Sequence, residues 1–224
     1  MANIHSVFEP QTYSEAKDIP EWEQAMEAEF QSLQKNHTRT LSDLPIGKTP
    51  ISCKWVYKVK YKADGTLDKY KARLVARGFS QKEGIDYEET FAPTAKMSTI
   101  RLVLALEAQF NWKFHQMDVK SAFLNGDLQE EVYMTQPPGF KVADQAQKVC
   151  RLVKALYGLK QAPRAWYMKI DKYLTDHGFQ QSPSDANLYI KHIGDDILFV
   201  VVYVDDLIIN GSSSHLIHGI KQDL

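Results

Sequence analysis

The fold is decided by the stretch Ile197-Leu198-Phe199-Val200-Val201-Val202-Tyr203-Val204-Asp205-Asp206-Leu207-Ile208-Ile209-Asn210. Its two apolar runs, 197–204 and 207–210, are short and rich in β-branched residues, which predicts two buried strands. The two acids between them predict a tight hairpin turn. Negative charge at the edge of an apolar core is costly unless a cation neutralises it. Mg²⁺, held by one or two carboxylates and phosphate oxygens, would do so.

A solvated turn without a metal is the alternative, because Asp is a common turn residue. The chain has a second acidic turn, Gly194-Asp195-Asp196, just upstream. A strand over 197–204 would be about 26 Å long at ~3.3 Å per residue. The two acidic turns therefore lie at opposite ends of one strand, and a single site can use only one of them.

Composition places the chain among globular proteins. Hydrophobic residues make up 44% and charged residues 25% of its 224 residues, and the net charge is −1. The two cysteines, Cys53 and Cys150, form no disulfide framework, which indicates a reducing compartment. The longest apolar run, eight residues from Ile197, is far short of the ~20 that span a bilayer, so we expect no membrane segment.

Positive charge gathers between residues 54 and 82, where nine basic residues face two acidic ones and the net charge is +7. Apolar and polar residues alternate over 54–62, the turn 63–66 follows, and 70–77 returns, which predicts a basic β-hairpin. This segment indicates either a polyanionic partner or a solvated lysine-rich face. The basic residues are Lys54, Lys58, Lys60, Lys62, Lys69, Lys71, Arg73, Arg77 and Lys82.

The rest of the pattern predicts an α+β fold, an antiparallel sheet with helices on one face. We expect residues 1–17 to be loose. Helices are predicted from Pro20, from Ser98 or Thr99 as the N-cap to about Phe110, and from Pro163 to Gly178. Strands are predicted over 112–119, 187–193, 197–204 and 207–210.

Asp118 is a lone acid in the apolar strand 112–119. If that strand adjoins the hairpin, Asp118, Asp205 and Asp206 would form a three-carboxylate trap for two Mg²⁺ ions. Two metals held ~4 Å apart clamp an in-line phosphoryl displacement. The basic hairpin offers cations for a triphosphate.

The chain closely resembles the reverse transcriptase of copia-type LTR retrotransposons, from about residue 15 to 211. The motifs that carry the resemblance are CKWVYKVK (53–60), KARLVARG (71–78), QMDVKSAFLNG (116–126), LYGLKQAPRAW (156–166) and YVDD (203–206). The resemblance implies a right-hand polymerase with fingers over 18–93 and 126–161. The palm would cover 94–125 and 162–224, truncated after the YVDD hairpin, with the thumb missing from this chain. Arg39 departs from the Trp that the family pattern has there.

The resemblance also implies residue roles. Asp118, Asp205 and Asp206 match the catalytic aspartates and metal ligands, joined by the Val119 carbonyl, and Asp195 and Asp196 remain a plain turn. Phe123 would lie under the sugar and select deoxynucleotides, although a core phenylalanine fits the sequence equally well. The remaining matches are nucleotide contacts at Lys60, Lys71, Arg73, Tyr157 and Gly158, and template or primer contacts at Lys160, Arg164 and Tyr203.

The implied activity is RNA-directed DNA polymerisation, with two Mg²⁺ ions (or Mn²⁺ as a substitute), an RNA template, a DNA primer and dNTPs. We expect weak or no processive activity from this chain alone, and either self-association or completion by the thumb and ribonuclease H of a parent polyprotein. The implied location is the cytoplasm, in a virus-like particle, with the nucleus as the alternative.

Other readings of the sequence stay open. A nucleic-acid-binding relic without catalysis would use only the basic hairpin. Gly47-Lys48-Thr49 is a weak P-loop signal, because Ser42 stands where that motif needs glycine. His215 and His218 have metal-ligand spacing but no evident third ligand.

Overall fold

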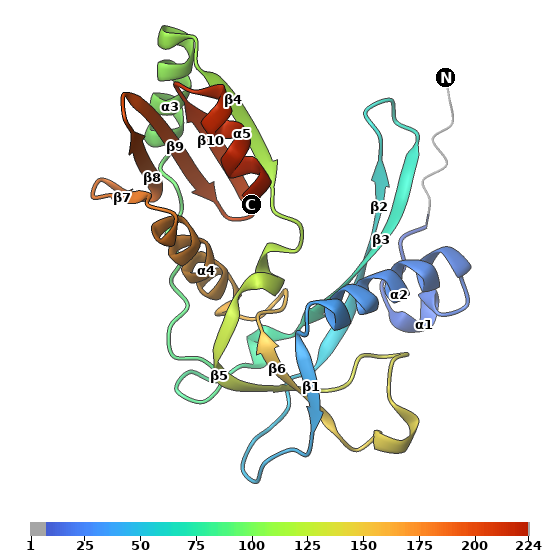
Figure 1. The fold of residues 1–224 in the computed structure, drawn as a ribbon. Helices are drawn as coiled ribbons and strands as arrows, with labels where there is room; N and C mark the ends of the chain where they lie inside the picture. The colour runs from blue at the N-terminus through green and yellow to red at the C-terminus, as the bar shows by residue number, and fades with distance from the viewer. Residues whose placement is uncertain (1–7, 224) are drawn as a thin grey trace. The chain divides into compact units, whose positions relative to one another are not determined.

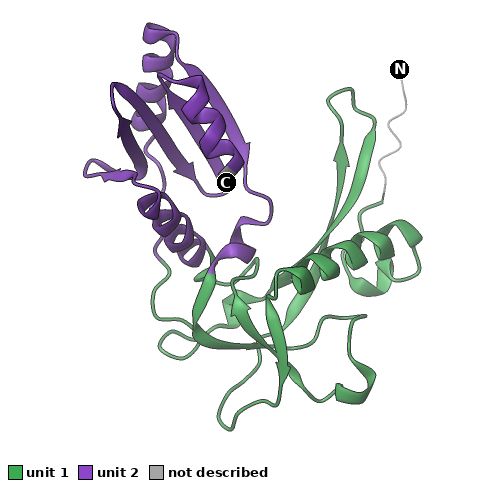
Figure 2. Cartoon of the chain, viewed as in Figure 1, with its two compact units in different colours: residues 1–90, 127–162 green, residues 91–126, 163–224 purple. Residues whose placement is uncertain are grey.

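Two compact units make up the chain in this computed structural model, which describes residues 8–223. Unit 1 comprises Met1–Thr90 and Asp127–Ala162, and unit 2 comprises Phe91–Gly126 and Pro163–Leu224 (Figure 2). The chain passes from one unit to the other after residues 90, 126 and 162. Within residues 8–223, no helix has the length and apolar character needed to span a bilayer.

Unit 1 contains an antiparallel sheet with strand order β1-β6-β5 and a separate hairpin, β2-β3 (Figure 1). Its helices are α1 (Tyr13–Ala16), α2 (Pro20–Lys35) and the short 3-10 helices η1 (Gly78–Ser80) and η3 (Ala143–Gln145). Its strands are β1 (Arg39–Ser42), β2 (Cys53–Tyr61), β3 (Leu67–Ala76), β5 (Asp127–Met134) and β6 (Val149–Lys154).

Helix α2 confirms the helix predicted from Pro20, with a proline in its first turn, where the missing N–H is not needed. Its buried Trp22 lies edge-on to Tyr57 and Tyr70 of the hairpin, with ring centroids 5.3 and 4.7 Å apart. Met26 accepts a hydrogen bond from the Tyr57 hydroxyl through its sulfur. Helix α2 therefore covers the apolar face of the hairpin.

The alternation predicted for the hairpin is confirmed. From Cys53 to Lys60, buried and exposed side chains alternate without a break. Because successive side chains of a strand point to opposite faces, the lysines of β2 lie on the face opposite the one covered by α2.

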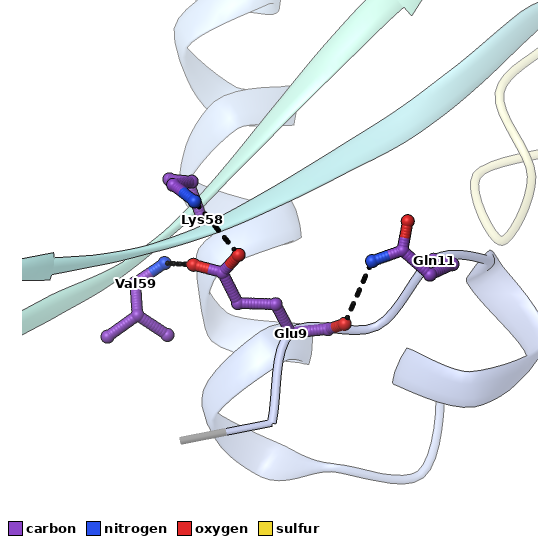
Figure 3. A network of polar contacts seen from close by, with 4 residues as sticks. All are labelled: Glu9, Gln11, Lys58 and Val59. Atoms are coloured by element: carbon purple, nitrogen blue, oxygen red, sulfur yellow. Dashed lines mark hydrogen bonds and ion pairs between the residues drawn. The ribbon is translucent and has the colours of Figure 1, made fainter. Parts of the chain in front are cut away.

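The expectation of a loose N-terminal segment was wrong for residues 8–17; residues 1–7 lie outside the described part. Glu9 accepts hydrogen bonds from the Val59 backbone N–H (2.8 Å) and from the Lys58 ammonium (3.0 Å) (Figure 3). Thr12 caps α1, whose Ala16 is fully buried. Residues 8–17 are held in place because Glu9 accepts a hydrogen bond from the Val59 N–H on the edge of β2 that has no partner strand. Folded proteins commonly cover such unpaired strand edges.

Unit 2 is built on an antiparallel sheet with strand order β4-β10-β9-β8-β7. The strands are β4 (Lys113–Asp118), β7 (Gln180–Ser182), β8 (Asp185–Ile193), β9 (Asp196–Tyr203) and β10 (Asp206–Gly211). The helices are α3 (Met97–Phe110), α4 (Ala162–Asp176, of which Ala162 falls in unit 1), α5 (Ser214–Asp223) and the 3-10 helix η2 (Ala122–Asn125).

Helices pack on both faces of this sheet, so the prediction of helices on one face was wrong. On one face, Val200 and Val202 of β9 join a core with Trp166 of α4 and residues of α5. On the other, the alternate residues Phe199 and Val201 pack with Val103 of α3. From Ile197 to Val202, strand β9 is apolar at every position rather than at every second one, which is the pattern of a strand buried on both sides.

Helix α3 begins at Met97, not after a Ser98 or Thr99 cap as predicted. The Asp185 carboxylate of β8 accepts hydrogen bonds from the Lys96 backbone N–H (2.9 Å) and the Thr99 hydroxyl (2.6 Å). The free N–H groups at a helix start can be satisfied by any nearby acceptor, and here it comes from a distant strand.

Candidate catalytic site

The acidic turn joins β9 to β10. Tyr203 and Asp206 are register partners, so Val204 and Asp205 form the two-residue loop and Asp206 opens β10. We predicted Asp205 and Asp206 as the loop; the observed turn is one residue earlier. Only one of the two acids is therefore in the loop, and the other is held in the sheet.

Val204 has a left-handed backbone, with φ +56°. Two-residue hairpin turns need positive φ, which glycine adopts without cost, but a β-branched residue there is a genuine outlier. The turn at the other end of β9 is a natural comparison: Gly194 takes the equivalent place with φ +59°, followed by Asp195 and Asp196. The same geometry is thus relaxed at one end of β9 and strained at the other.

Trp166 of α4 holds the strained turn through its indole. The indole Nε1–H donates a hydrogen bond to the Val204 carbonyl (2.5 Å), and the ring is buried, with 5% of the residue exposed. Trp166 is also part of the core between α4 and the sheet. Its contact with the turn had no sequence signal, because it joins positions 38 residues apart.

Asp118, at the end of β4, is the register partner of Asp206. Directly opposed residues of an antiparallel pair point to the same face, with Cβ atoms about 5 Å apart. The Val119 backbone N–H donates to the Asp205 carbonyl oxygen (2.8 Å), which ties the end of β4 to the turn. The structure therefore brings Asp118 and Asp206 to one face of the sheet and ties Val119 to Asp205 through the backbone.

Gln116 was missed by our sequence reasoning. Its side-chain amide donates to Asp206 Oδ1 (3.1 Å). Gln116 lies two residues before Asp118, and the two-residue period of a strand places both on one face. That spacing was the signal that could have identified it.

The site fits Mg²⁺ by its donors but is not a closed cage. Two like charges opposite each other destabilise a sheet, and a cation would offset that repulsion. Across residues 8–223, however, no three His, Cys, Asp or Glu side chains form a ready metal cluster. Mg²⁺ typically takes one or two carboxylates and completes its shell with water and substrate phosphates, which agrees with an open pair of carboxylates.

Phe123 lies in η2, a few residues after Asp118, and is half-buried. It packs against the core formed by the sheet, α4 and α5. Both roles given to Phe123, sugar contact and core residue, stay predictions.

The predicted triphosphate contacts lie in unit 1, on the lysine face of the hairpin. Lys58 is the register partner of Lys71, and Lys60 that of Lys69. Arg73 follows on the same face. Burial, and then the charges of Arg73 and Lys60, lower the pKa of Lys71. We call Lys58, Lys60, Lys69, Lys71 and Arg73 the cation ladder.

Tyr157 and Gly158 dock on the end of β3, beside the cation ladder. Arg73 stacks over the Tyr157 ring, 4.5 Å from its centroid. Gly158 has φ +91°, and a Cβ there would overlap the Ala76 carbonyl oxygen. Packing alone therefore requires glycine at 158, whatever its part in nucleotide binding.

The predicted template and primer contacts are divided between the units. In unit 1, Lys160 donates to the Tyr87 hydroxyl (3.1 Å) and lies over its ring. In unit 2, Arg164 donates to the Phe91 carbonyl (3.2 Å), and Tyr203 is 41% exposed beside the acidic turn. Their roles stay predictions.

The weaker motifs find no support. Gly47-Lys48-Thr49 lies in the turn and loop between β1 and β2, with no helix following it as a P-loop needs. The His218 ring contacts the Gln222 side chain (3.0 Å) on α5, and no metal cluster includes His215 or His218 among the described residues.

Comparisons with known proteins agree with these motifs. The family model "Reverse transcriptase (RNA-dependent DNA polymerase)" matches residues 36–224. The chain is 48% identical, over 96% of its length, to the retrovirus-related Pol polyprotein from transposon TNT 1-94 of Nicotiana tabacum. It is 45% and 46% identical, over 96% and 93% of its length, to those from transposons RE1 and RE2 of Arabidopsis thaliana. The chain spans only 17%, 15% and 14% of these three relatives. It therefore belongs to the reverse transcriptase family, in the branch of the copia-type transposon Pol polyproteins.

Proposed function

We propose that this chain carries the fingers and palm of an RNA-directed DNA polymerase, with unit 1 as the fingers and unit 2 as the palm. Asp118, Asp205 and Asp206, with the Val119 carbonyl, would hold Mg²⁺ in unit 2. Two Mg²⁺ ions, when bound, neutralise the attacking and leaving oxygens of an in-line displacement. The observation that carries the proposal is the pairing of Asp118 with Asp206 in adjacent strands.

Positioning is the contribution that this chain's own residues would make. Phosphoryl transfer needs little covalent chemistry from the protein and depends on placement and charge. Gln116 and Trp166 hold Asp206 and the turn, respectively. In unit 1, Lys58 of the cation ladder already pairs with Glu9. The remaining members, Lys60, Lys69, Lys71 and Arg73, would bind phosphate oxygens, because like charges in register repel unless an anion lies between them.

The test is addition of a single dTTP to an oligo(dT) primer on poly(rA), with Mg²⁺ or Mn²⁺. Asp118→Asn should abolish incorporation and weaken Mn²⁺ binding measured by electron paramagnetic resonance. Asp195→Asn, in the comparison turn at the other end of β9, is the matched control and should change neither. If the wild-type chain neither incorporates dTTP nor binds Mn²⁺, the catalytic proposal fails.

A second candidate, nucleic-acid binding without catalysis, is favoured specifically by the cation ladder. Binding through phosphates weakens linearly on a log–log plot against salt. Lys60→Ala should reduce that slope by about 0.7 to 0.9 for each phosphate that Lys60 neutralises. Salt-sensitive RNA binding that Asp118→Asn leaves intact, without any incorporation by the wild type, would favour this candidate.

A further inference from the structure

Helix α3 exposes much of its apolar surface. It packs on the unit 2 sheet through Val103, with Ile100 and Leu106 beside it, on the face opposite α4 and α5. Four of its large apolar side chains are nevertheless 40% to 58% exposed: Met97, Leu102, Leu104 and Phe110. Apolar side chains that gather on one exposed face mark an interaction surface, whereas single ones are ordinary. The question is therefore which of these side chains share a face.

One exposed face of α3 is centred on Leu104. Because an α-helix turns about 100° per residue, Met97 and Ala108 lie within roughly 40° of Leu104 around the helix axis. Leu102 lies about 160° from Leu104, on the side of the polar Ser98. We call Met97, Leu104 and Ala108 the α3 stripe. It runs from the first turn of the helix to the last, and Leu102 is outside it.

Two opposite charges flank the α3 stripe symmetrically. Within α3 (Met97–Phe110), Arg101 and Glu107 are the only charged side chains, three residues before and three residues after Leu104. Arg101 is exposed, Glu107 is half-buried, and neither has an ion-pair partner in the described part of the chain. A twofold axis through Leu104 exchanges these two positions between copies. The helix is therefore complementary in charge to an antiparallel copy of itself.

We propose that α3 is a self-association surface, on which two copies of this chain pair antiparallel about Leu104. Leu104 packs on Leu104 of the second copy, and the small Ala108 lets the two helices approach closely. Arg101 pairs with Glu107 of the second copy, twice in each dimer. One helix from each copy makes a small interface, so the dimer is weak and depends on protein concentration. The inference concerns association alone and does not depend on polymerase activity.

Sedimentation velocity of the full chain tests the stripe. Over roughly a hundredfold range of concentration, the weight-average sedimentation coefficient of the wild type should rise from that of a monomer towards that of a dimer. Leu104→Asp should stay monomeric, because two carboxylates would meet at the twofold axis. Leu102→Asp is the matched control, an exposed leucine of the same helix outside the stripe, and should associate like the wild type. Circular dichroism confirms that each variant is folded.

Reversal of the two charges tests the pairing between copies. Arg101→Glu and Glu107→Arg each replace two attractive pairs in the dimer by two repulsive ones, so each should weaken association about tenfold. An equal mixture of the two variants should associate like the wild type, because every pair in the mixed dimer is again attractive. The double variant should also associate within about twofold of the wild type. If either single variant fails to fold, the double variant carries the same test.

Three results would overturn the proposal. The first is a wild-type chain that stays monomeric over the whole concentration range, as expected if α3 docks on a different polypeptide. The second is loss of association in Leu102→Asp, or its survival in folded Leu104→Asp. The third is a mixture of the two charge variants, or a double variant, that associates as weakly as either single variant alone.

Discussion

Trp166→Phe is expected to weaken cation binding at the acidic turn although Trp166 is no metal ligand. The variant keeps a buried aromatic ring and removes the donor to the Val204 carbonyl. Such a hydrogen bond contributes about 1 kcal/mol, and the left-handed backbone of a non-glycine residue costs about 1–2 kcal/mol. The two terms are of similar size, so without the bond the turn at Val204 should relax.

The expected loss of cation affinity follows from comparing these two energies. A loss of about 1 kcal/mol from the geometry that binds the ion corresponds to about fivefold weaker binding. Glycine adopts positive φ freely, as Gly194 does in the comparison turn. In a Val204→Gly background, Trp166→Phe should therefore weaken binding by less than about twofold.

The assay is Mn²⁺ titration of four proteins by electron paramagnetic resonance: wild type, each single variant and the double variant. Urea unfolding confirms that each is folded, because the smaller ring also lowers stability through poorer packing. Trp112→Phe, on the α3 face of the same sheet, is the control and should leave Mn²⁺ affinity unchanged. If Trp166→Phe weakens binding equally with and without Val204→Gly, or in neither case, the reasoning is refuted.

Three further outcomes are expected. Gly158→Ala should lower the free energy of unfolding by at least about 2 kcal/mol in urea, because the new Cβ would overlap the Ala76 carbonyl oxygen; an unchanged midpoint would contradict this. The hydrogen bond to the Val59 N–H, followed by that to the Lys58 ammonium, lowers the pKa of Glu9. The stabilisation by Glu9 is thus fully present above the unfolded pKa of about 4.3 and disappears as pH falls through the lower folded pKa. Hydrogen-exchange protection of the Val59 amide should fall in that window, and Glu9→Gln should abolish the pH dependence. Burial raises the pKa of Cys53 to about 11, so iodoacetamide should label it at pH 8 only after unfolding; rapid labelling of the folded chain would show the thiol to be accessible.

The spacing of apolar residues was enough to predict a secondary-structure element where a single two-residue or helical period ran through the segment. The alternation over 54–62 predicted the β2 strand and its lysine face, and the helical spacing after Pro20 predicted α2. The same reasoning failed where a partner came from far along the chain. Asp185 supplies the N–H acceptor at the start of α3, and Glu9 orders an N-terminal segment that has no pattern of its own.

The amino-acid sequence by itself determined the basic hairpin, helix α2 and four strands of the unit 2 sheet, and it carried the motifs of the reverse transcriptase family with their three aspartates, because these depend on residue type and short spacing. Only the tertiary structure decided that Asp118 faces Asp206, that Val204 rather than Asp206 is in the turn, and that Trp166 holds its carbonyl. The physical reason is strand register. A shift of one residue moves every side chain to the other face of a sheet, and that register is set by packing on both faces of β9, which no local window of sequence contains.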